Sequence, residues 1–343
     1  MSSTTRIPEK HKVPGVCYAV TDDGIELPVV DITHKAFCLT VGTEDLAAIA
    51  AESIHGLEQS MRLPGFVRRL IARRSILMRA TMEASGTVLS GMGTYLFKLG
   101  PDNLGEGYAG QLDRRIASSI TPVCVRLRLQ AMARLISDAL SPALASSKNE
   151  PIHLINIAGG PFMDSLNALI LLKKEHPELL AQRRISVHVL DRDQAGPHFG
   201  TRALDALLTK GAPLPGLDIS MKHVDYDWTT PSSLRAILKL TGIKHAVAVG
   251  SSEGGLFEYG TDRDIVSNLE VLRESTREDF VMAGSIVRDE DVPKKIRDMG
   301  HLTLRTLGLE RFRKLAARAG WLVDRTIEGN TLYHVVGMIK AAE

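Results

Sequence analysis

The chain contains few cysteines and aromatic residues and no long apolar run. Its 343 residues include three cysteines, Cys17, Cys38 and Cys124, an odd and scattered set that argues against a disulfide framework and favours a reducing compartment. No run approaches the roughly 18 apolar residues that span a bilayer, and the polar first residues do not resemble a secretory signal. We therefore expect a cytoplasmic protein with no membrane partner.

Metal-binding and nucleophile motifs are also missing. The sequence has no Cys-x-x-Cys and no His-x-x-x-His, which predicts no metal site. The segment 250–254 lacks the Gly-x-Ser-x-Gly spacing of a serine nucleophile. Aromatic residues make up only 5% and are not interleaved with basic ones, so a nucleic-acid partner is not favoured. A homodimer is compatible with the composition.

Charge is nearly balanced overall but uneven along the chain. The formal net charge is +2, yet residues 55–150 contain thirteen Lys and Arg against seven Asp and Glu. Much of this excess comes from arginines in a predicted helix at 64–80. Such a run is typical of a solvated helix face, and the alternative is a surface that meets an anionic ligand.

The first 145 residues and the remainder follow different patterns. Residues 15–33 predict a β-hairpin around the turn that ends in Asp23-Gly24, and helical patterns follow from Thr43 onward. The segment 141–151 is the best linker candidate. We therefore expect a hairpin-plus-helical cap region over 1–145 and a second domain over 146–343. The helices are predicted at 43 onward, 64–86, 87–98 and 123–140.

From residue 151 strands and helices alternate, which is typical of a parallel α/β sheet. The last two strands are joined by only four residues, 328–331, so they must pair antiparallel. The sequence thus predicts a doubly wound, mostly parallel seven-stranded sheet ending in an antiparallel hairpin. The predicted strands are 152–158, 185–191, 220–226, 245–250, 279–286, 321–327 and 332–339.

The segment 152–165 contains a buried strand, a turn with Gly159 and Gly160, and the start of a helix at Asp164. Two adjacent glycines at the carboxyl end of a first parallel strand let the backbone approach a ligand closely. With the closing hairpin, residues 151–341 resemble the class I S-adenosylmethionine-dependent methyltransferases. The usual Gly-x-Gly-x-Gly is reduced here to Ala-Gly-Gly-Pro at 158–161.

The resemblance implies S-adenosylmethionine as cofactor, in contact with the carboxyl ends of the first four strands. Asp191 ends the second strand, where a carboxylate can accept hydrogen bonds from both ribose hydroxyls; Asp193 is the alternative. Asp227, or else Asp225, follows the third strand, where the family has an acid for the adenine amino group. The cofactor-binding residues expected from this resemblance are Asn156, Ala158, Gly159, Gly160, Asp164, Asp191, Arg192, Asp227, Trp228, Ser251 and Ser252.

Catalytic and acceptor residues are expected around the fourth strand and in the helical cap. Glu253 follows that strand directly and is the first candidate for a base or a polar substrate contact, with Tyr259 and His301 behind it. In the cap, Tyr95 and Asn103 lie near helix-breaking glycines and are expected to project into a cleft. Arg126, or else Arg128, is expected to pair with the carboxylate of the cofactor from this acceptor region.

The resulting hypothesis is methyl transfer to a small-molecule acceptor held between the helical cap and the sheet. A protein that has lost catalysis but keeps the binding fold is one alternative. The other is an NAD-dependent oxidoreductase, against which the missing Gly-x-Gly-x-x-Gly and the 31-residue separation of Gly160 and Asp191 both argue.

Overall fold

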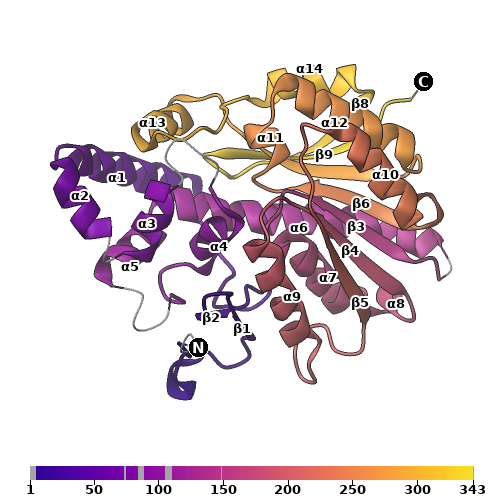
Figure 1. The fold of residues 1–343 in the computed structure, drawn as a ribbon, viewed down its shortest axis with the longest axis horizontal. Coiled ribbons are helices and arrows are strands. Elements are labelled where there is room, and N and C mark those ends of the chain that lie inside the picture. Colours follow the sequence, from indigo (N-terminus) through magenta and orange to yellow (C-terminus); the bar gives the residue numbers. More distant parts are fainter. Residues whose placement is uncertain (1–4, 73–74, 84–88, 105–109, 148, 343) are drawn as a thin grey trace.

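One seven-stranded sheet forms the centre of the molecule. A computed structural model describes residues 5–72, 75–83, 89–104, 110–147 and 149–342. The strand order is β5-β4-β3-β6-β7-β9-β8, with helices on both faces (Figure 1). The strands are β3 (Ile152–Ile157), β4 (Arg184–Leu190), β5 (Asp218–Val224), β6 (Val247–Ser252), β7 (Val281–Val287), β8 (Trp321–Ile327) and β9 (Tyr333–Lys340).

The direction of the strands confirms the predicted fold class. The five strands from β3 to β7 pair parallel, and β9 runs antiparallel between β7 and β8. The chain order reverses beside β3, whose two neighbours are β4 and β6. In an open α/β sheet this switch point is where ligands bind, outside the carboxyl ends of the strands.

Alternating side chains of the strands fill two separate cores. In β3, Ile152 and Leu154 join the core under α6, α7 and α9, whereas Ile155 and Ile157 face the core under α10, α12 and α14. The helices of the second half are α7 (Met163–Glu175), α8 (Pro177–Leu180), α9 (Ala195–Leu208), α10 (Pro231–Thr241), α11 (Leu256–Tyr259), α12 (Asp262–Ser275), α13 (Asp291–Gly300) and α14 (Leu309–Arg318).

The region before the sheet is helical with a short hairpin, as predicted. Strands β1 (Tyr18–Val20) and β2 (Glu26–Pro28) pair antiparallel. Within the described residues, the arginine-rich helix expected over 64–86 corresponds to two helices, α2 (Gly65–Ala72) and α3 (Ile76–Glu83); residues 73–74 and 84–86 of that range lie outside the described residues. The helices of this region are α1 (Thr43–Met61), α2 (Gly65–Ala72), α3 (Ile76–Glu83), α4 (Gly91–Leu99), α5 (Gln111–Ala117) and α6 (Ile120–Ser146).

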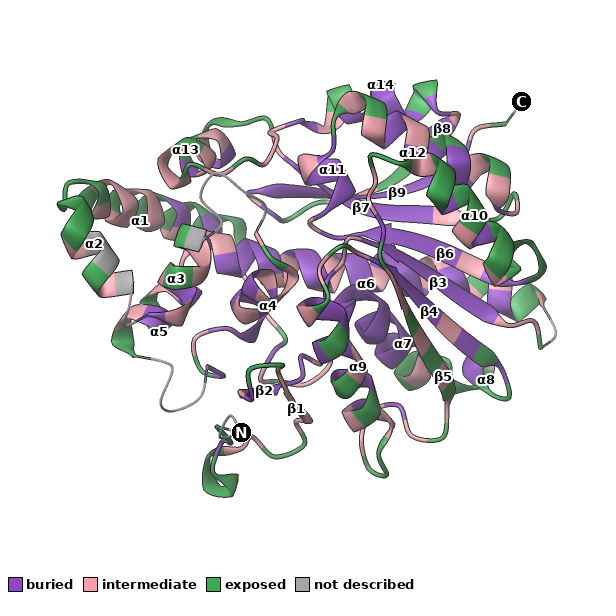
Figure 2. Cartoon of the chain, in the orientation of Figure 1, coloured by how far each residue is buried: buried purple, intermediate pink, exposed green. Residues whose placement is uncertain are grey.

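The predicted linker at 141–151 is wrong for its first half, because α6 continues through Pro142 to Ser146. Proline interrupts one helical hydrogen bond, but most of α6 is buried against the sheet and α7 (Figure 2), and tertiary packing outweighs local propensity. The division at 145/146 stays a prediction. The core under α6 extends from the hairpin to β9, on both sides of that boundary.

Among the helices of the described residues, none is both long enough and apolar enough to cross a membrane.

Candidate functional site

The turn between β3 and α7 has left-handed residues at every second position. Ala158 has φ +54°, Gly160 φ +53° and Phe162 φ +46°. Left-handed backbone disfavours residues with a Cβ, at a cost of roughly 1–2 kcal/mol each. The spacing of these positions is that of Gly-x-Gly-x-Gly, so the motif is Ala158-x-Gly160-x-Phe162 and not the adjacent glycines read from the sequence.

Two further glycines cover this turn. A Cβ on Gly160 would lie 2.7 Å from the Gly91 Cα at the start of α4. A Cβ on Gly196, in the first turn of α9, would lie 2.8 Å from the Gly160 Cα. Three backbone segments therefore meet at Gly160, and no side chain fits between them.

Asp191 contacts the turn directly. Its Oδ2 accepts a hydrogen bond from the Gly160 N–H at 2.9 Å, and its Oδ1 accepts one from the Asp193 N–H at 2.9 Å. Burial raises the pKa of Asp191, while these two N–H groups oppose the shift. The carboxylate lies at the predicted edge of the sheet, and each oxygen keeps one further lone pair for a ligand.

The acid after β5 is more exposed. Asp227 accepts hydrogen bonds from the backbone and hydroxyl of Thr229, which lower its pKa, and pairs with Arg192 at 3.1 Å. Trp228 is half-buried and packs against the core under α10 and α12. The carbonyl of Trp228 accepts a hydrogen bond from Asn268.

A buried polar cluster lies beneath the turn. Asn156 donates to Asp164 Oδ1 at 2.7 Å and to Ser251 Oγ at 3.1 Å, so it connects β3, α7 and β6. Asp164 is fully buried. Burial, and after it the nearby Glu253 carboxylate, raises the pKa of Asp164 to about 6.

Three buried oxygens around the turn have no hydrogen-bond partner in the described part of the chain: Asn156 Oδ1, Asp164 Oδ2 and Asp193 Oδ2. All three are acceptors. Buried polar groups are nearly always hydrogen-bonded, so unpaired ones call for an explanation such as a ligand. A ligand that donates hydrogen bonds or carries positive charge fits this set.

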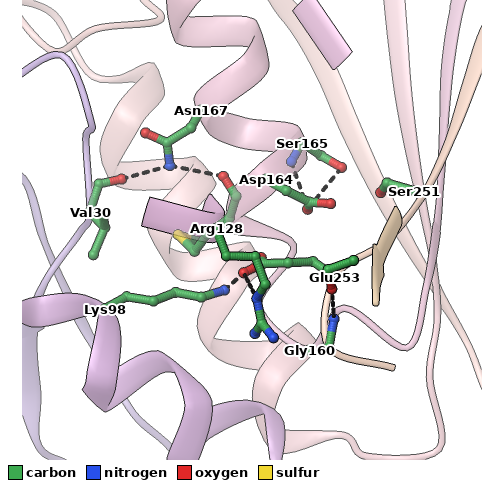
Figure 3. A network of polar contacts seen from close by, with 12 residues as sticks. Val30, Lys98, Arg128, Gly160, Asp164, Ser165, Asn167, Ser251 and Glu253 are labelled. Atoms are coloured by element: carbon green, nitrogen blue, oxygen red, sulfur yellow. Dashed lines mark hydrogen bonds and ion pairs between the residues drawn. The ribbon is translucent and has the colours of Figure 1, made fainter. Parts of the chain in front are cut away.

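Glu253 is held by two cations (Figure 3). Its Oε2 accepts from Lys98 Nζ of α4 at 2.8 Å, and its Oε1 accepts from Arg128 Nε of α6 at 3.2 Å. All three side chains are almost fully buried. Burial acts to raise the pKa of Glu253, but Lys98 and Arg128 outweigh it and the net pKa is lowered.

The same arginine extends the network to β7. Arg128 donates to Glu258 at 2.8 Å, and Ser285 donates to the same Glu258 oxygen at 2.7 Å. The guanidinium lies 4.4 Å from the centre of the Tyr333 ring on β9. Burial raises the pKa of Glu258 despite Arg128.

The other predicted catalytic residues lie apart from one another. Tyr259 ends α11 and is half-buried; burial, and after it Glu258, raises its pKa to about 12. His301 is exposed at the left-handed C-cap of α13. Ser252 accepts from the N–H of Leu256, the first residue of α11.

The predicted acceptor residues of the cap do not project into a cleft. Tyr95 lies within α4, is fully buried, and donates through its hydroxyl to the Pro28 carbonyl at 2.6 Å. Asn103 is buried and donates to the carbonyls of Ala36 and Leu99. The predicted projection into a cleft is wrong for both, because their polar groups satisfy backbone groups of the cap. Asn103 does lie in a loop, as predicted, whereas Tyr95 lies within a helix.

Arg126 faces the same loop region. Its guanidinium packs against Gly100, where a Cβ would lie 2.9 Å from Cζ, and one nitrogen donates to the Phe37 carbonyl at 3.5 Å. Burial lowers the pKa of Arg126. Arg128 is the other arginine considered for a carboxylate. It lies at the carboxyl end of β6, where it pairs with Glu253 and Glu258.

Comparison with known proteins finds similarity in structure only. No family model matches the sequence, and no curated protein matches it. A possible exported protein from Bordetella parapertussis has 15% identity and a TM-score of 0.56, with 88% of this chain and 98% of that chain covered. That likeness shows a shared fold over nearly the whole of both chains.

Two further structures align over a smaller part of the chain. The pyocyanin biosynthetic protein PhzM has 16% identity and a TM-score of 0.41, covering 66% of this chain and 58% of that one. A Burkholderia thailandensis 1,6-didemethyltoxoflavin-N1-methyltransferase with bound S-adenosylhomocysteine has 12% identity and a TM-score of 0.38, covering 62% and 79%. Strand order, the inserted antiparallel β9 and the turn at 158–162 decide the architecture. The chain has the class I methyltransferase fold.

A cavity of about 530 Å³ lies elsewhere on this methyltransferase fold. It is lined by the carboxyl-terminal half of α6 and by β7, β8 and β9, and includes Val281 and Ile339. Val281 is the first residue of β7, and a seven-residue strand spans about 20 Å. The cavity therefore lies at the end of the sheet where β7 begins, opposite the end where β4 finishes beside Asp191.

Sequence reasoning missed Lys98 and did not connect Glu258 to Arg128. The partners lie 155 and 130 positions apart in the chain. The available signal was the pair of acids 253 and 258 after an apolar strand, since buried acids need cationic partners.

Proposed function

We propose that the protein binds S-adenosylmethionine at the carboxyl edge of its sheet and transfers the methyl group to a small-molecule acceptor. The observation that carries the proposal is the turn at 158–162. It lies at the switch point of the sheet, has the left-handed spacing of a glycine-rich ligand loop, and is surrounded by unpaired buried acceptors.

The residues around the turn fit this cofactor chemically. Its amino group and sulfonium are positively charged, and Asn156, Asp164 and Asp193 offer unpaired oxygens. Asp191 keeps lone pairs for ribose hydroxyls beside Gly160. Asp227 and Trp228, after β5, would contact the adenine, with Arg192 holding the Asp227 carboxylate.

When bound, the cofactor supplies an activated methyl group, so the protein chiefly has to position the acceptor. Glu253 is fixed between Lys98 and Arg128, and the pKa of Tyr259 is about 12. Both suit positioning through hydrogen bonds better than proton removal at neutral pH. The acceptor would lie between the helical cap and the sheet. The three cysteines are unpaired, which suits a cytoplasmic enzyme.

A second candidate is a binding protein that has kept the fold without catalysis. The contact of Gly91 with Gly160 favours it, because α4 then covers the turn that a cofactor would approach. The presence of Ala158 and Phe162, instead of glycine, at left-handed positions of the turn also favours this second candidate.

Ligand binding separates the candidates. Thermal unfolding with S-adenosylmethionine, S-adenosylhomocysteine and NAD should shift only with the adenosyl-sulfur ligands, since a ligand at 100 times its Kd adds about 2.7 kcal/mol to native stability. In calorimetry, Asp191→Ala should weaken binding by about 1.5–3 kcal/mol through loss of hydrogen bonds to a charged group.

Asp218→Ala is the matched control, because Asp218 is an exposed acid at the amino end of β5. It should bind like the parent. A shift with NAD alone, or no shift with either sulfur ligand, would reject the proposal. Binding without methyl loss across an acceptor panel would select the second candidate.

A further inference from the structure

Exposed large apolar side chains gather at one end of the molecule. Among the described residues seven large hydrophobic side chains are exposed, and five of them lie between residues 61 and 82. We call these five the α2 patch: Met61, Leu63, Phe66, Leu70 and Met82. The other two, Leu240 and Leu322, belong to α10 and β8.

Helix α2 presents the most exposed members. Phe66 is 70% exposed and Leu70 56% exposed. They are four positions apart, so they lie one above the other on the same face of the helix. In Figure 1, α2 lies at the far left end of the molecule, away from the sheet. An apolar face placed at such a tip marks an interaction site.

The same segment is strongly basic. Between Glu58 and Glu83 the sequence has six arginines and no aspartate or glutamate, whereas residues 151–343 contain equal numbers of acidic and basic residues. Arg62, at the end of α1, and Arg79, on α3, are exposed. The excess of arginine is therefore local to the stretch of sequence that contains the α2 patch.

We propose that the α2 patch docks the protein on an anionic lipid surface. Basic residues around an exposed apolar helix face are the features of a helix that lies in the bilayer interface, with arginines at the headgroups and apolar side chains below them. Lysine- and arginine-rich segments attract negatively charged lipids, while Phe66 and Leu70 supply the apolar insertion. Nucleic acid would use the charge but leave the apolar face unexplained.

This docking differs from the expectation that the chain has no membrane partner. That expectation rested on the lack of a spanning run, and a helix lying in the interface needs none. The proposal is independent of methyl transfer, since it uses no residue of the sheet edge.

Vesicle flotation of the full chain tests the proposal. The protein should float with phosphatidylglycerol–phosphatidylcholine vesicles and not with pure phosphatidylcholine vesicles, and added salt should release it. Phe66→Ser with Leu70→Ser should reduce binding at least tenfold. Leu240→Ser, at a leucine on α10 that is more exposed than either Phe66 or Leu70, should bind like the parent.

The charge requirement has its own pair of variants. Arg62→Gln with Arg79→Gln should weaken binding severalfold, and Arg184→Gln, an exposed arginine at the start of β4, should not. Circular dichroism checks that each variant is folded.

Failure of the parent chain to float with anionic vesicles would overturn the proposal. So would equal binding by the Phe66/Leu70 variant. Binding to heparin or RNA that survives this variant, without vesicle binding, would assign the patch to a polyanion instead.

Discussion

Asp164 combines full burial, a raised pKa and one unpaired oxygen at the centre of the site. Burial without a direct cationic partner destabilises the ionised form, so the free protein is less stable whenever this carboxylate is charged. A positively charged ligand would offset that cost. The residue therefore connects stability to ligand binding.

The variant Asp164→Asn tests this connection. The native pKa of about 6 lies above the ordinary value of 3.8, so ionisation destabilises the native state above pH 6. The variant should be more stable than the parent at pH 8, by about 1–3 kcal/mol. This advantage should shrink as pH falls below 6 and disappear near pH 4, where the carboxyl is protonated in both the native and the unfolded parent.

Urea unfolding at pH 8 and pH 5 measures the difference, and calorimetry with S-adenosylmethionine should show weaker binding by the variant. Asp205→Asn, an exposed acid on α9, is the control and should change neither. Equal stability of Asp164→Asn and the parent at pH 8 would contradict this account.

At the scale of elements, α4 connects the helical cap to both parts of the site. Its first residue, Gly91, contacts Gly160, and Lys98 in its last turn pairs with Glu253. Tyr95 between them anchors the helix to the hairpin through Pro28. A displacement of α4 would therefore change the turn and the ion network together.

Gly91→Ala should perturb this contact. The added Cβ would lie 2.8 Å from the Gly160 Cα, closer than real Cβ atoms approach backbone, so α4 or the turn must shift. We expect a loss of about 1–3 kcal/mol of unfolding free energy, as for other overpacked sites. Denaturant unfolding measures it.

Gly56→Ala is the matched control, because Gly56 lies inside α1 and nothing lies within 4 Å of its Cβ position. That variant should gain roughly 0.5–1 kcal/mol from helix propensity. If Gly91→Ala also increased the free energy of unfolding, the close contact between α4 and the turn would be contradicted.

At the scale of the whole molecule, a buried histidine pair makes stability depend on pH. His153 on β3 and His188 on β4 stack with ring centres 5.1 Å apart, and His153 Nδ1 lies 3.0 Å from His188 Nε2. Burial, and after it His153, lowers the pKa of His188 to about 4. Both rings are neutral in the native sheet at pH 7.

Below its ordinary value of about 6.5, His188 takes up a proton in the unfolded chain but not in the native one. Stability from this residue is therefore complete above pH 6.5 and falls as pH drops toward 4. Between pH 7.5 and pH 5 the loss should be about 2 kcal/mol. His188→Gln should remove this part of the pH dependence in urea unfolding.

His245→Gln, at an exposed histidine before β6, should keep the pH dependence of the parent. Equal slopes for the His188 and His245 variants between pH 7.5 and pH 5 would contradict the role of the pair.

Much of the fold could be predicted because it depends on short-range patterns. The alternation of apolar strand segments with helices from β3 to β7, and the short link between β8 and β9, can be read from a few neighbouring residues at a time. Helix ends were less predictable. The sequence pattern predicts a helix at 201–209, but α9 begins at Ala195. Gly196 and Gly200 are unfavourable in a helix by propensity, and only the close packing of Gly160 and Phe162 against them accounts for their place in α9.

The sequence by itself therefore determined the sheet, its closing hairpin and the placing of Asp191, Asp227 and Glu253 after strands. Only the tertiary structure decided that β9 enters between β7 and β8, that Lys98 and Arg128 meet Glu253, and that α4 covers Gly160. Periodicity is set by neighbouring residues, whereas the β7–β9 pairing and the contacts of Glu253 and Gly160 join segments more than 40 positions apart and depend on how layers pack.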